Sequence, residues 1–412
     1  MSLLEKLDSK KNWDAFYKFK SESAAPGKGK LKSLKAFIDK KEYHNIAKKI
    51  IDGEYRFSYP LKTTVNKKGT NKKRVIYRFQ KKESFILKLL TFLLYKYDRE
   101  LSPNCYSFRR GLCAQSAIKD IVKIKNNDKK YVLKIDIHDY FNSVPSERLS
   151  EEIALIINDD KPLCTLLQNL VTINKACLKS AESKYSVIEE NRGAMAGIPV
   201  SAFFANIYLR GLDRIFFEKN IPYFRYSDDI LILCDTKEDV EEYKTLIFNY
   251  IEKRGLTINQ EKLRIYSPGE KWEFLGFSYQ NGTIDIAEVS VEKIKAKIKR
   301  KAKAMLRRKK RKNEDFFTVA ADLADCFNRK FYDDENEDGF TWSRWYFPLL
   351  TTAESLKKID LYLEQYLRFL STGRHTKKNF SVRYKELKEL GFRSLVNEYY
   401  KRRWNKNQRR DS

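Results

Sequence analysis

Three aspartates interrupt apolar, strand-like runs of this 412-residue chain. The segment FRYSDDILIL at 224–233 sets Asp228 and Asp229 side by side, and the segment YVLKIDI at 131–137 carries Asp136. Aspartate is a poor strand residue, and a buried carboxylate costs stability unless it is paired or binds a cation. Two strands that carry carboxylates at their ends or turns can bring them together across a sheet. On its own, the Asp228-Asp229 pair could equally be the polar tip of a turn.

Together the three aspartates suit divalent cations. Mg²⁺ prefers a few carboxylate oxygens plus substrate phosphates. In phosphoryl-transfer sites two such ions lie about 3.5–4 Å apart, where one activates the attacking oxygen and the other stabilises the leaving group. We therefore expect Asp136, Asp228 and Asp229 to bind two Mg²⁺ ions, with Mn²⁺ as the alternative metal. Asp139, three residues after Asp136, is expected in a turn or on the surface.

The residues around the aspartate pair predict the element that positions it. Residues 224–226 and 230–233 are typical strand sequences. The short polar segment between them predicts a tight hairpin with Asp228 and Asp229 at its tip. The apolar run at 131–137 predicts a further strand. The aspartates are thus expected to be presented by a sheet.

The rest of the chain divides into zones of different composition. Within the first zone we expect a helix over 1–20, a Ser/Gly/Pro-rich linker at 21–30, and one further helix that stops at Gly53. An acidic loop is expected at 331–340. The predicted zones are an N-terminal helical extension (1–54), a core of strands and helices (55–285), a basic helical region (286–372) and a basic C-terminal tail (373–412).

The charge of the chain predicts a polyanionic partner. Its 83 Lys and Arg residues against 55 Asp and Glu residues leave a formal net charge of +28, which favours nucleic acid or an anionic membrane surface. The sequence shows no run of about 18 apolar residues, and its first residues are too polar and acidic for a signal peptide. We therefore expect no membrane partner and a cytoplasmic location. The six cysteines form no CxxC pair and are expected to be reduced.

One segment concentrates this charge. KIKAKIKRKAKAMLRRKKRK at 293–312 has 13 basic residues in 20 and no acid, yet Ile294, Ile298, Ala302 and Met305 form a helical apolar stripe. The pattern predicts an amphipathic helix that binds a nucleic-acid backbone with strong salt dependence. A solvated helix face and an anionic membrane surface are the alternatives. The candidate nucleic-acid-binding residues are Lys299, Arg300, Arg307, Arg308, Lys309, Lys310 and Arg311.

A Tyr-x-Asp-Asp hairpin downstream of a strand aspartate that aromatic residues follow resembles the palm of a reverse transcriptase. The family's other blocks occur in order: NKKRVIYRF (71–79), CYSFRRGLCAQSAIKDI (105–121), KIDIHDYFNSV (134–144), GAMAGIPVSAFFANIYLRGLD (193–213), KRGLTINQEKLRIY (253–266) and WEFLGF (272–277). The resemblance implies an α+β right-hand polymerase with fingers and an antiparallel-sheet palm interleaved in 55–285. It also implies an all-helical thumb at 286–372.

The resemblance also implies roles for residues of these blocks. Ile137 joins the three aspartates in the metal site, and Lys262 donates a proton to the leaving pyrophosphate. The residues expected to contact the incoming nucleotide are Arg74, Arg109, Arg110, Phe141, Pro199 and Val200. The residues expected to hold the primer end are Phe274, Leu275 and Gly276.

Phe141 lies where the family places an aromatic residue that blocks a ribose 2′-hydroxyl. It stands five residues after Asp136, whereas a viral RNA polymerase would be expected to have an aspartate there. The resemblance therefore implies deoxynucleotide substrates and argues against an RNA polymerase. The neighbouring Tyr140 would take this role if the register differed by one residue.

One position departs from the family pattern. Val200-Ser201 follow Gly197-Ile198-Pro199 where the family commonly has Gln-Gly. In this feature the chain resembles the unknown-group and defence-associated bacterial reverse transcriptases, relatives of retron and abortive-infection enzymes. The resemblance implies an RNA-directed DNA polymerase that copies a structured non-coding RNA into DNA in antiphage defence. The alternatives are a template-independent DNA polymerase and a non-catalytic RNA-binding scaffold.

Overall fold

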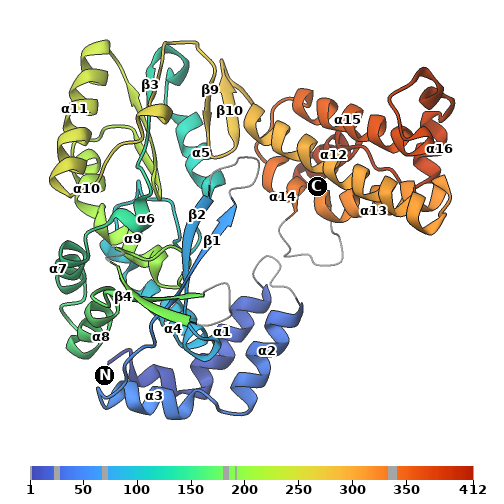
Figure 1. Cartoon of the computed structure of the whole chain (residues 1–412). Coiled ribbons are helices and arrows are strands. Elements are labelled where there is room, and N and C mark those ends of the chain that lie inside the picture. The colour runs from blue at the N-terminus through green and yellow to red at the C-terminus, as the bar shows by residue number, and fades with distance from the viewer. Residues whose placement is uncertain are drawn as a thin grey trace. The chain divides into compact units, whose positions relative to one another are not determined.

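The computed structural model describes residues 2–22, 28–66, 73–179, 185–190, 193–332 and 341–411. Half of the predicted linker, most of the predicted acidic loop and the first two residues of NKKRVIYRF lie outside these ranges. The chain forms two compact units, Met1–Glu270 and Lys271–Ser412 (Figure 1).

The first unit is built around a four-stranded antiparallel sheet. Its strands, in the order β6-β7-β3-β8, are β6 (Tyr223–Tyr226), β7 (Asp229–Cys234), β3 (Tyr131–Asp136) and β8 (Arg264–Tyr266). The central strands β3 and β7 are apolar along most of their length because they are covered by helices. The covering helices that contact the sheet are α11 (Lys237–Lys253), α10 (Arg210–Glu218) and α5 (Ala114–Lys123) (Figure 1).

The predicted hairpin is present, but its turn differs by one residue. Tyr226 pairs with Asp229, so the loop consists of Ser227 and Asp228 alone. Ser227 has a φ of 62° and Asp228 does not share this left-handed conformation, which is the pattern of a type II′ turn. The prediction that both aspartates lie at the tip is wrong, because Asp229 begins strand β7.

A second sheet of the first unit carries most of the block NKKRVIYRF (71–79) on one of its strands. Its strands, in the order β2-β1-β4-β5, are β2 (Lys73–Arg78), β1 (Leu61–Asn66), β4 (Lys175–Lys179) and β5 (Tyr185–Glu189). The pairs β1–β2 and β4–β5 are antiparallel, and β1 pairs with β4 in parallel. The main-chain N–H of Tyr77 in β2 donates to the carbonyl of Ala196 at 2.8 Å. This bond fixes β2 against the loop that precedes α9 (Ser201–Tyr208).

The N-terminal helices pack into the core of the first unit. They are η1 (Glu5–Asp8), α1 (Lys10–Glu22), α2 (Lys28–Asp39) and α3 (His44–Ile51). The single helix predicted up to Gly53 is therefore wrong, since Lys41 adopts a φ of 50° and ends the first of two helices. The apolar period continued across this break because both helices face one core. In that core Phe37 lies 5.1 Å from Phe85, and Phe16 lies 5.7 Å from Phe92, between ring centroids.

The remaining helices of the first unit connect these sheets. The α-helices are α4 (Lys81–Leu94), α6 (Tyr140–Ser143), α7 (Ser146–Ile156) and α8 (Lys161–Val171). The 3-10 helices are η2 (Tyr95–Glu100), η3 (Asn127–Lys129) and η4 (Gln260–Lys262). In the described residues no helix is long and apolar enough to cross a membrane.

The second unit combines a small sheet with helices. Its strands, in the order β11-β10-β9, are β11 (Thr283–Ile286), β10 (Phe277–Gln280) and β9 (Trp272–Phe274). Its helices are α12 (Glu288–Lys312), α13 (Phe316–Phe331), α14 (Trp342–Tyr346), α15 (Glu354–Thr372), η5 (Lys377–Ser381), α16 (Tyr384–Glu389) and α17 (Leu395–Asp411). The predicted apolar stripe of α12 is buried against α13 and α15. The predicted helical character of this region is confirmed.

The small sheet belongs with the helices that follow it. The hydroxyl of Ser355 in α15 donates to Asp285 of β11 at 2.7 Å, and the main-chain N–H of Thr351 donates to the carbonyl of Ile284 at 3.0 Å. The chain therefore divides at residue 270, before the predicted end of the core at 285. The predicted fold class, α+β with an antiparallel palm sheet and a helical C-terminal region, is confirmed.

Candidate active site

The three predicted aspartates lie at one end of the four-stranded sheet, where β3 ends and β7 begins. Asp136 at the end of β3 pairs directly with Asp229 at the start of β7. Directly opposed residues of antiparallel strands place their side chains on the same face. The main-chain N–H of Ile137 donates to the carbonyl of Asp228 at 3.1 Å, which fixes the turn beside the end of β3. The register and this bond therefore gather three carboxyl groups from two segments that lie far apart in the sequence.

Asp136 makes two side-chain contacts with the segment after α11. Its Oδ2 accepts from the Lys262 ammonium at 2.6 Å, and its Oδ1 accepts from the Asn259 amide at 3.1 Å. The main-chain N–H of Asn259 also donates to the Asp136 carbonyl, at 2.8 Å. The structure thus brings Lys262 into the carboxylate cluster. It adds Asn259, which the sequence did not single out because it is an unremarkable polar residue in a loop.

The pKa values of the cluster reflect buried carboxylates that lie near one another with little positive charge to offset them. Burial, together with the charge of Asp136, raises the pKa of Asp228 above its ordinary value. Burial and the carboxylates of Asp228 and Asp136 raise the pKa of Asp229 to about 7. Burial alone would lower the pKa of Lys262, but its hydrogen bond to Asp136 and the charge of that carboxylate raise it. A bound cation would stabilise the charged form of these carboxylates.

The donor set fits Mg²⁺, although the side chains are not converged around an ion position. No group of three or more Asp, Glu, His or Cys side chains in the described ranges is close enough to hold a metal ion. Both carboxylate oxygens of Asp136 accept hydrogen bonds, from Lys262 and Asn259. The Ile137 side chain has no donor atom, so this residue could contribute only its main-chain carbonyl. These are all hard oxygen donors, which Mg²⁺ and Mn²⁺ take.

Phe141 and Arg74 form one wall beside the cluster. Phe141, in α6, is half-buried, and the Arg74 guanidinium of β2 lies over its ring at 5.8 Å from the centroid. Tyr140 is buried, and its hydroxyl donates to the Ala205 carbonyl at 2.6 Å. The register therefore presents Phe141, and not Tyr140, next to Arg74. Asp139 is exposed in the preceding turn, as expected.

Phe108 extends this wall and was missed by the sequence reasoning. Its ring centroid lies 6.3 Å from that of Phe141 and 6.1 Å from that of Tyr226. The side chain is 41% exposed, and the residue has a φ of 56°, which is uncommon for a bulky residue. An exposed aromatic in a strained backbone conformation between two site residues is a candidate contact for a bound nucleotide. Sequence spacing alone does not reveal such a conformation.

The two other predicted nucleotide-binding arginines are used within the protein. The Arg109 guanidinium donates to the carbonyls of Ser102, Cys105 and Asp98 at 2.8, 3.0 and 2.9 Å. The Arg110 guanidinium lies over the rings of Phe92 and Tyr95 at 4.5 and 4.6 Å. A triphosphate would have to compete with these contacts, so their role in nucleotide binding stays a prediction.

The loop before α9 is held by β2 and α6. The Ala196 N–H donates to the Asn142 side chain at 3.0 Å, and Gly197 has a φ of 103° where a Cβ would meet the Tyr77 carbonyl at 3.0 Å. Pro199 is half-buried, whereas the Val200 side chain is fully buried. Val200 can therefore act on a nucleotide only through its main chain or through the shape of this loop.

The predicted primer-grip residues form a hairpin turn in the second unit. Leu275 and Gly276 connect β9 to β10 and have φ values of 50° and 87°. Two central residues with positive φ define a type I′ turn, which favours glycine. Phe274 is buried, while Leu275 and Gly276 are half-exposed and could contact a ligand.

The candidate basic residues of α12 fall into two groups. Arg308 is paired with Glu314 and Asp322 at 2.6 and 2.5 Å, and Lys309 donates to the Leu370 carbonyl at 3.0 Å. These two side chains bind neighbouring helices. The side chains exposed to solvent are Lys299, Arg300, Arg307, Lys310 and Arg311.

Paired carboxylates at the ends of two central strands, next to an arginine and an aromatic wall, agree with the polymerase palm that the sequence predicts. Residues 65–279 match the family model of reverse transcriptase (RNA-dependent DNA polymerase). This match covers more than half of the chain, and the chain belongs to that family. The predicted reverse transcriptase family is thereby confirmed.

A curated relative supports the bacterial resemblance. The chain is 23% identical over 209 residues to the Retron Mx65 reverse transcriptase of Myxococcus xanthus, covering 50% of this chain and 47% of that protein. The chain therefore spans about half the length of the curated relative it matches. The predicted resemblance to bacterial retron-like reverse transcriptases is confirmed.

Solved structures show weaker similarity. Apo telomerase from Candida tropicalis has a TM-score of 0.48 and 13% identity, covering 76% of this chain and 57% of that one. An RdRp complex has a TM-score of 0.44 and 12% identity, covering 61% of this chain and 26% of that one.

Proposed function

We propose that the protein is an RNA-directed DNA polymerase that adds deoxynucleotides to a primer end. The observation that carries the proposal is the direct pairing of Asp136 with Asp229, with Asp228 tied to the end of the same strand through Ile137. In this reaction a 3′-hydroxyl group releases its proton to water, and its oxygen attacks the α-phosphorus of a dNTP to form a phosphodiester bond. The bond from the α-phosphorus to the oxygen that bridges it to the β-phosphate breaks, and pyrophosphate leaves.

The three aspartates and Lys262 have different chemical roles in this proposal. Asp136 and Asp228, with Asp229 assisting, would hold two Mg²⁺ ions, or Mn²⁺. When bound, these ions lower the pKa of the attacking hydroxyl and neutralise the leaving group. Lys262 lies within hydrogen-bonding reach of Asp136, and we assign to its ammonium the proton that the departing pyrophosphate takes up.

The wall beside the carboxylates selects and holds the nucleotide. Arg74 is exposed and stacked over Phe141, so its guanidinium is available to phosphate oxygens. We assign to Phe141 the exclusion of a ribose 2′-hydroxyl, and Phe108 adds an apolar surface beside it. The turn at Leu275-Gly276 is proposed to contact the primer end. This assignment supports deoxynucleotides over ribonucleotides as substrates.

The partner that fits the charge is a structured non-coding RNA, which serves as the template. The exposed cations of α12 would bind its backbone, and the DNA copy would be the product. A matched relative is a retron reverse transcriptase, and on this basis we propose a cytoplasmic bacterial enzyme that acts in antiphage defence.

A second candidate function is template-independent DNA synthesis. Its support is the buried Val200 at a position where the family commonly has a glutamine. Without that amide, the protein has one hydrogen-bonding group fewer with which to hold an incoming nucleotide. Synthesis that does not depend on base pairing with a template would be consistent with this change.

The two candidates are separated by nucleotide incorporation with protein purified together with its bound RNA. Labelled dNTPs and, separately, NTPs are supplied with Mg²⁺, before and after RNase treatment. Incorporation of dNTPs that stops after RNase supports RNA-templated synthesis, and sequencing the product identifies the template. Incorporation that survives RNase supports template-independent addition. Failure of the wild type to incorporate, with RNA still bound, supports a non-catalytic scaffold.

A further inference from the structure

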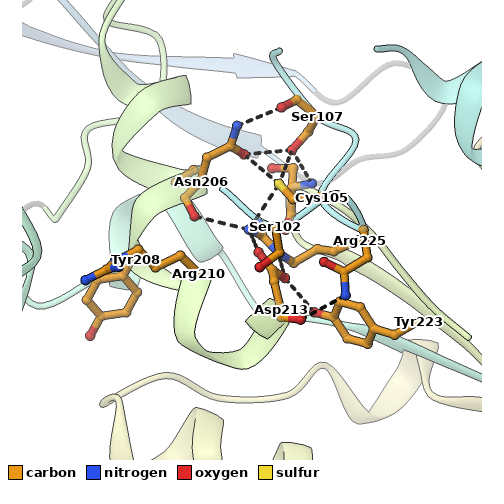
Figure 2. A network of polar contacts seen from close by, with 12 residues as sticks. Ser102, Cys105, Ser107, Asn206, Tyr208, Arg210, Asp213, Tyr223 and Arg225 are labelled. Carbon is orange, nitrogen blue, oxygen red and sulfur yellow. Dashed lines mark hydrogen bonds and ion pairs between the residues drawn. The ribbon is translucent and has the colours of Figure 1, made fainter. Parts of the chain in front are cut away.

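A buried ion pair contacts the turn at Ser227-Asp228, which we call the catalytic turn. Neither residue of this pair has a role in the proposed reaction. Arg225 immediately precedes Tyr226 on β6, and Asp213 lies on α10. Both side chains are 0% exposed. The guanidinium donates to both carboxylate oxygens, from Nε to Oδ1 at 2.7 Å and from Nη2 to Oδ2 at 2.5 Å (Figure 2). A buried pair is often no more stabilising than an apolar replacement, so its presence calls for a second role.

The same guanidinium reaches the catalytic turn. Its Nη1 donates to the carbonyl of Ser227 at 3.2 Å, and this carbonyl belongs to the peptide group that joins Ser227 to Asp228. Its Nη2 also donates to the carbonyl of Asn206 on α9 at 3.1 Å and lies 3.3 Å from the Cys105 sulfur (Figure 2). Arg225 therefore holds the turn against α9 and α10.

The opposite side of Ser227 is held by a second contact. The Ser227 N–H donates to the Ser107 hydroxyl oxygen at 2.9 Å, and that hydroxyl donates to the Asn206 side chain at 2.8 Å. The Asn206 amide in turn donates to the Ser107 carbonyl at 2.7 Å (Figure 2). Both main-chain polar groups of Ser227 are thus fixed by buried partners.

Ser227 needs such support because of its backbone conformation. Its φ of 62° is unfavourable for a residue other than glycine, and such conformations persist only where the surroundings hold them. The segment that supplies Ser107 also supplies Phe108 and lies along β6, where Cys105 bridges to Arg225. The network therefore connects the catalytic turn to the aromatic side chains of Phe108 and Phe141.

We propose that the Arg225–Asp213 pair, acting with Ser107, is a positioning device that sets the place of Asp228 relative to Asp136 and to the nucleotide wall. These are positioning residues, since they act through the main chain of Ser227. The inference rests on the proposed polymerase function. A pair that served stability alone would change the amount of folded protein and leave the turnover of each folded molecule unchanged.

Two variants test the device. Ser107→Ala removes one hydrogen bond to the turn without burying a charge. The double variant Arg225→Met/Asp213→Leu removes the pair and leaves neither charge unpaired. The matched control is Glu152→Gln, which weakens the ion pairs of Glu152 with Arg210 and Arg254 in the same unit. Folded protein is quantified by circular dichroism and thermal melting before kcat, the KM for dNTP and the half-saturating Mg²⁺ concentration are measured.

We expect kcat per folded molecule to fall about tenfold in Ser107→Ala and about a hundredfold in the double variant, because a displacement of about 1 Å at a reacting group costs on this order. The KM for dNTP should change less than about twofold, half-saturating Mg²⁺ should rise, and Glu152→Gln should match the wild type per folded molecule.

Wild-type kcat per folded molecule in Ser107→Ala would overturn the inference, whether or not the double variant folds. A rise in KM at unchanged kcat would overturn it as well. Absence of incorporation by the wild type would instead contradict the proposed function itself.

Discussion

Asp136 and Asp229 lie directly opposite each other at the ends of two antiparallel strands that are apolar along most of their length. Two carboxylates at this spacing repel each other, and Asp228 adds a third from the adjoining turn. The ammonium of Lys262 offsets part of this charge through Asp136. The arrangement is costly for a protein that binds no cation, and it supplies the carboxylates of the divalent-metal site that we propose.

Lys262 is predicted to have two separable effects. Lys262→Met removes the proposed proton donor, and kcat should fall about a hundredfold or more. The same change frees the Oδ2 oxygen of Asp136, so the half-saturating Mg²⁺ concentration should also fall. Steady-state incorporation at varied Mg²⁺ measures both. Lys262→Arg keeps the charge beside Asp136, and a fall in half-saturating Mg²⁺ there would contradict this account.

Phe141 is predicted to select deoxyribonucleotides over ribonucleotides. Phe141→Ala should lower the preference for dNTP over NTP by roughly tenfold to a hundredfold, because a small side chain no longer excludes the 2′-hydroxyl. The ratio of kcat/KM values for the two substrates is the measurement. Tyr140→Phe is the control, since that ring is buried and its hydroxyl donates to the Ala205 carbonyl, away from the wall. Unchanged selectivity in Phe141→Ala would remove Phe141 from the selection of sugar.

Asp229 should make the metal-free protein less stable as the pH rises. Burial and two neighbouring carboxylates raise its pKa to about 7. The folded state therefore holds a proton that the unfolded state loses near pH 4, and stability falls as the pH rises from about 4 to about 7. We expect a lower melting temperature at pH 8 than at pH 6 in the presence of a chelator. Asp229→Asn should reduce this difference, and an undiminished difference would contradict the prediction.

The exposed cations of α12 are predicted to bind a nucleic-acid backbone. Arg300→Gln/Arg307→Gln should weaken RNA binding and make the slope of log affinity against log salt shallower by about one for each phosphate that is no longer neutralised. Filter binding or anisotropy with the co-purified RNA at several salt concentrations measures the slope. Lys48→Gln/Lys49→Gln removes two exposed charges of α3 and should leave it unchanged.

Arg308 should behave differently from its neighbours. Since its guanidinium is paired with Glu314 and Asp322, Arg308→Gln should lower thermal stability more than it changes the salt slope. A large change in slope with unchanged stability would place Arg308 among the residues that bind RNA.

The parts of the fold that could be predicted from the sequence are those governed by local patterns. An apolar run interrupted by an aspartate indicated β3 and its carboxylate, and the helical period indicated α12 with its buried stripe. The break at Lys41 escaped because α2 and α3 share one core, so the apolar period does not reveal the turn. Asp229 was predicted at the tip because the sequence does not show which residue pairs with Tyr226, and a shift of one residue moves Asp229 from the turn into the strand.

The parts of the site that could not be predicted depend on contacts across the chain. Arg109 and Arg110 have the right residue type for phosphate, but main-chain carbonyls and aromatic rings use their guanidinium groups. Phe108 is recognisable only by its conformation, and Arg225 only by its burial against Asp213. Sequence spacing carries no information on either property.

The most direct measurement for the central claim is Mg²⁺-dependent dNTP incorporation by the wild type and by Asp228→Ala/Asp229→Ala. Asp139→Ala, an exposed carboxylate three residues after Asp136, is the matched control. We predict incorporation by the wild type and by the control, and a loss of at least roughly a thousandfold in the double variant, with RNA binding retained in all three. Equal incorporation by the double variant, or none by the wild type with its RNA bound, would contradict the account.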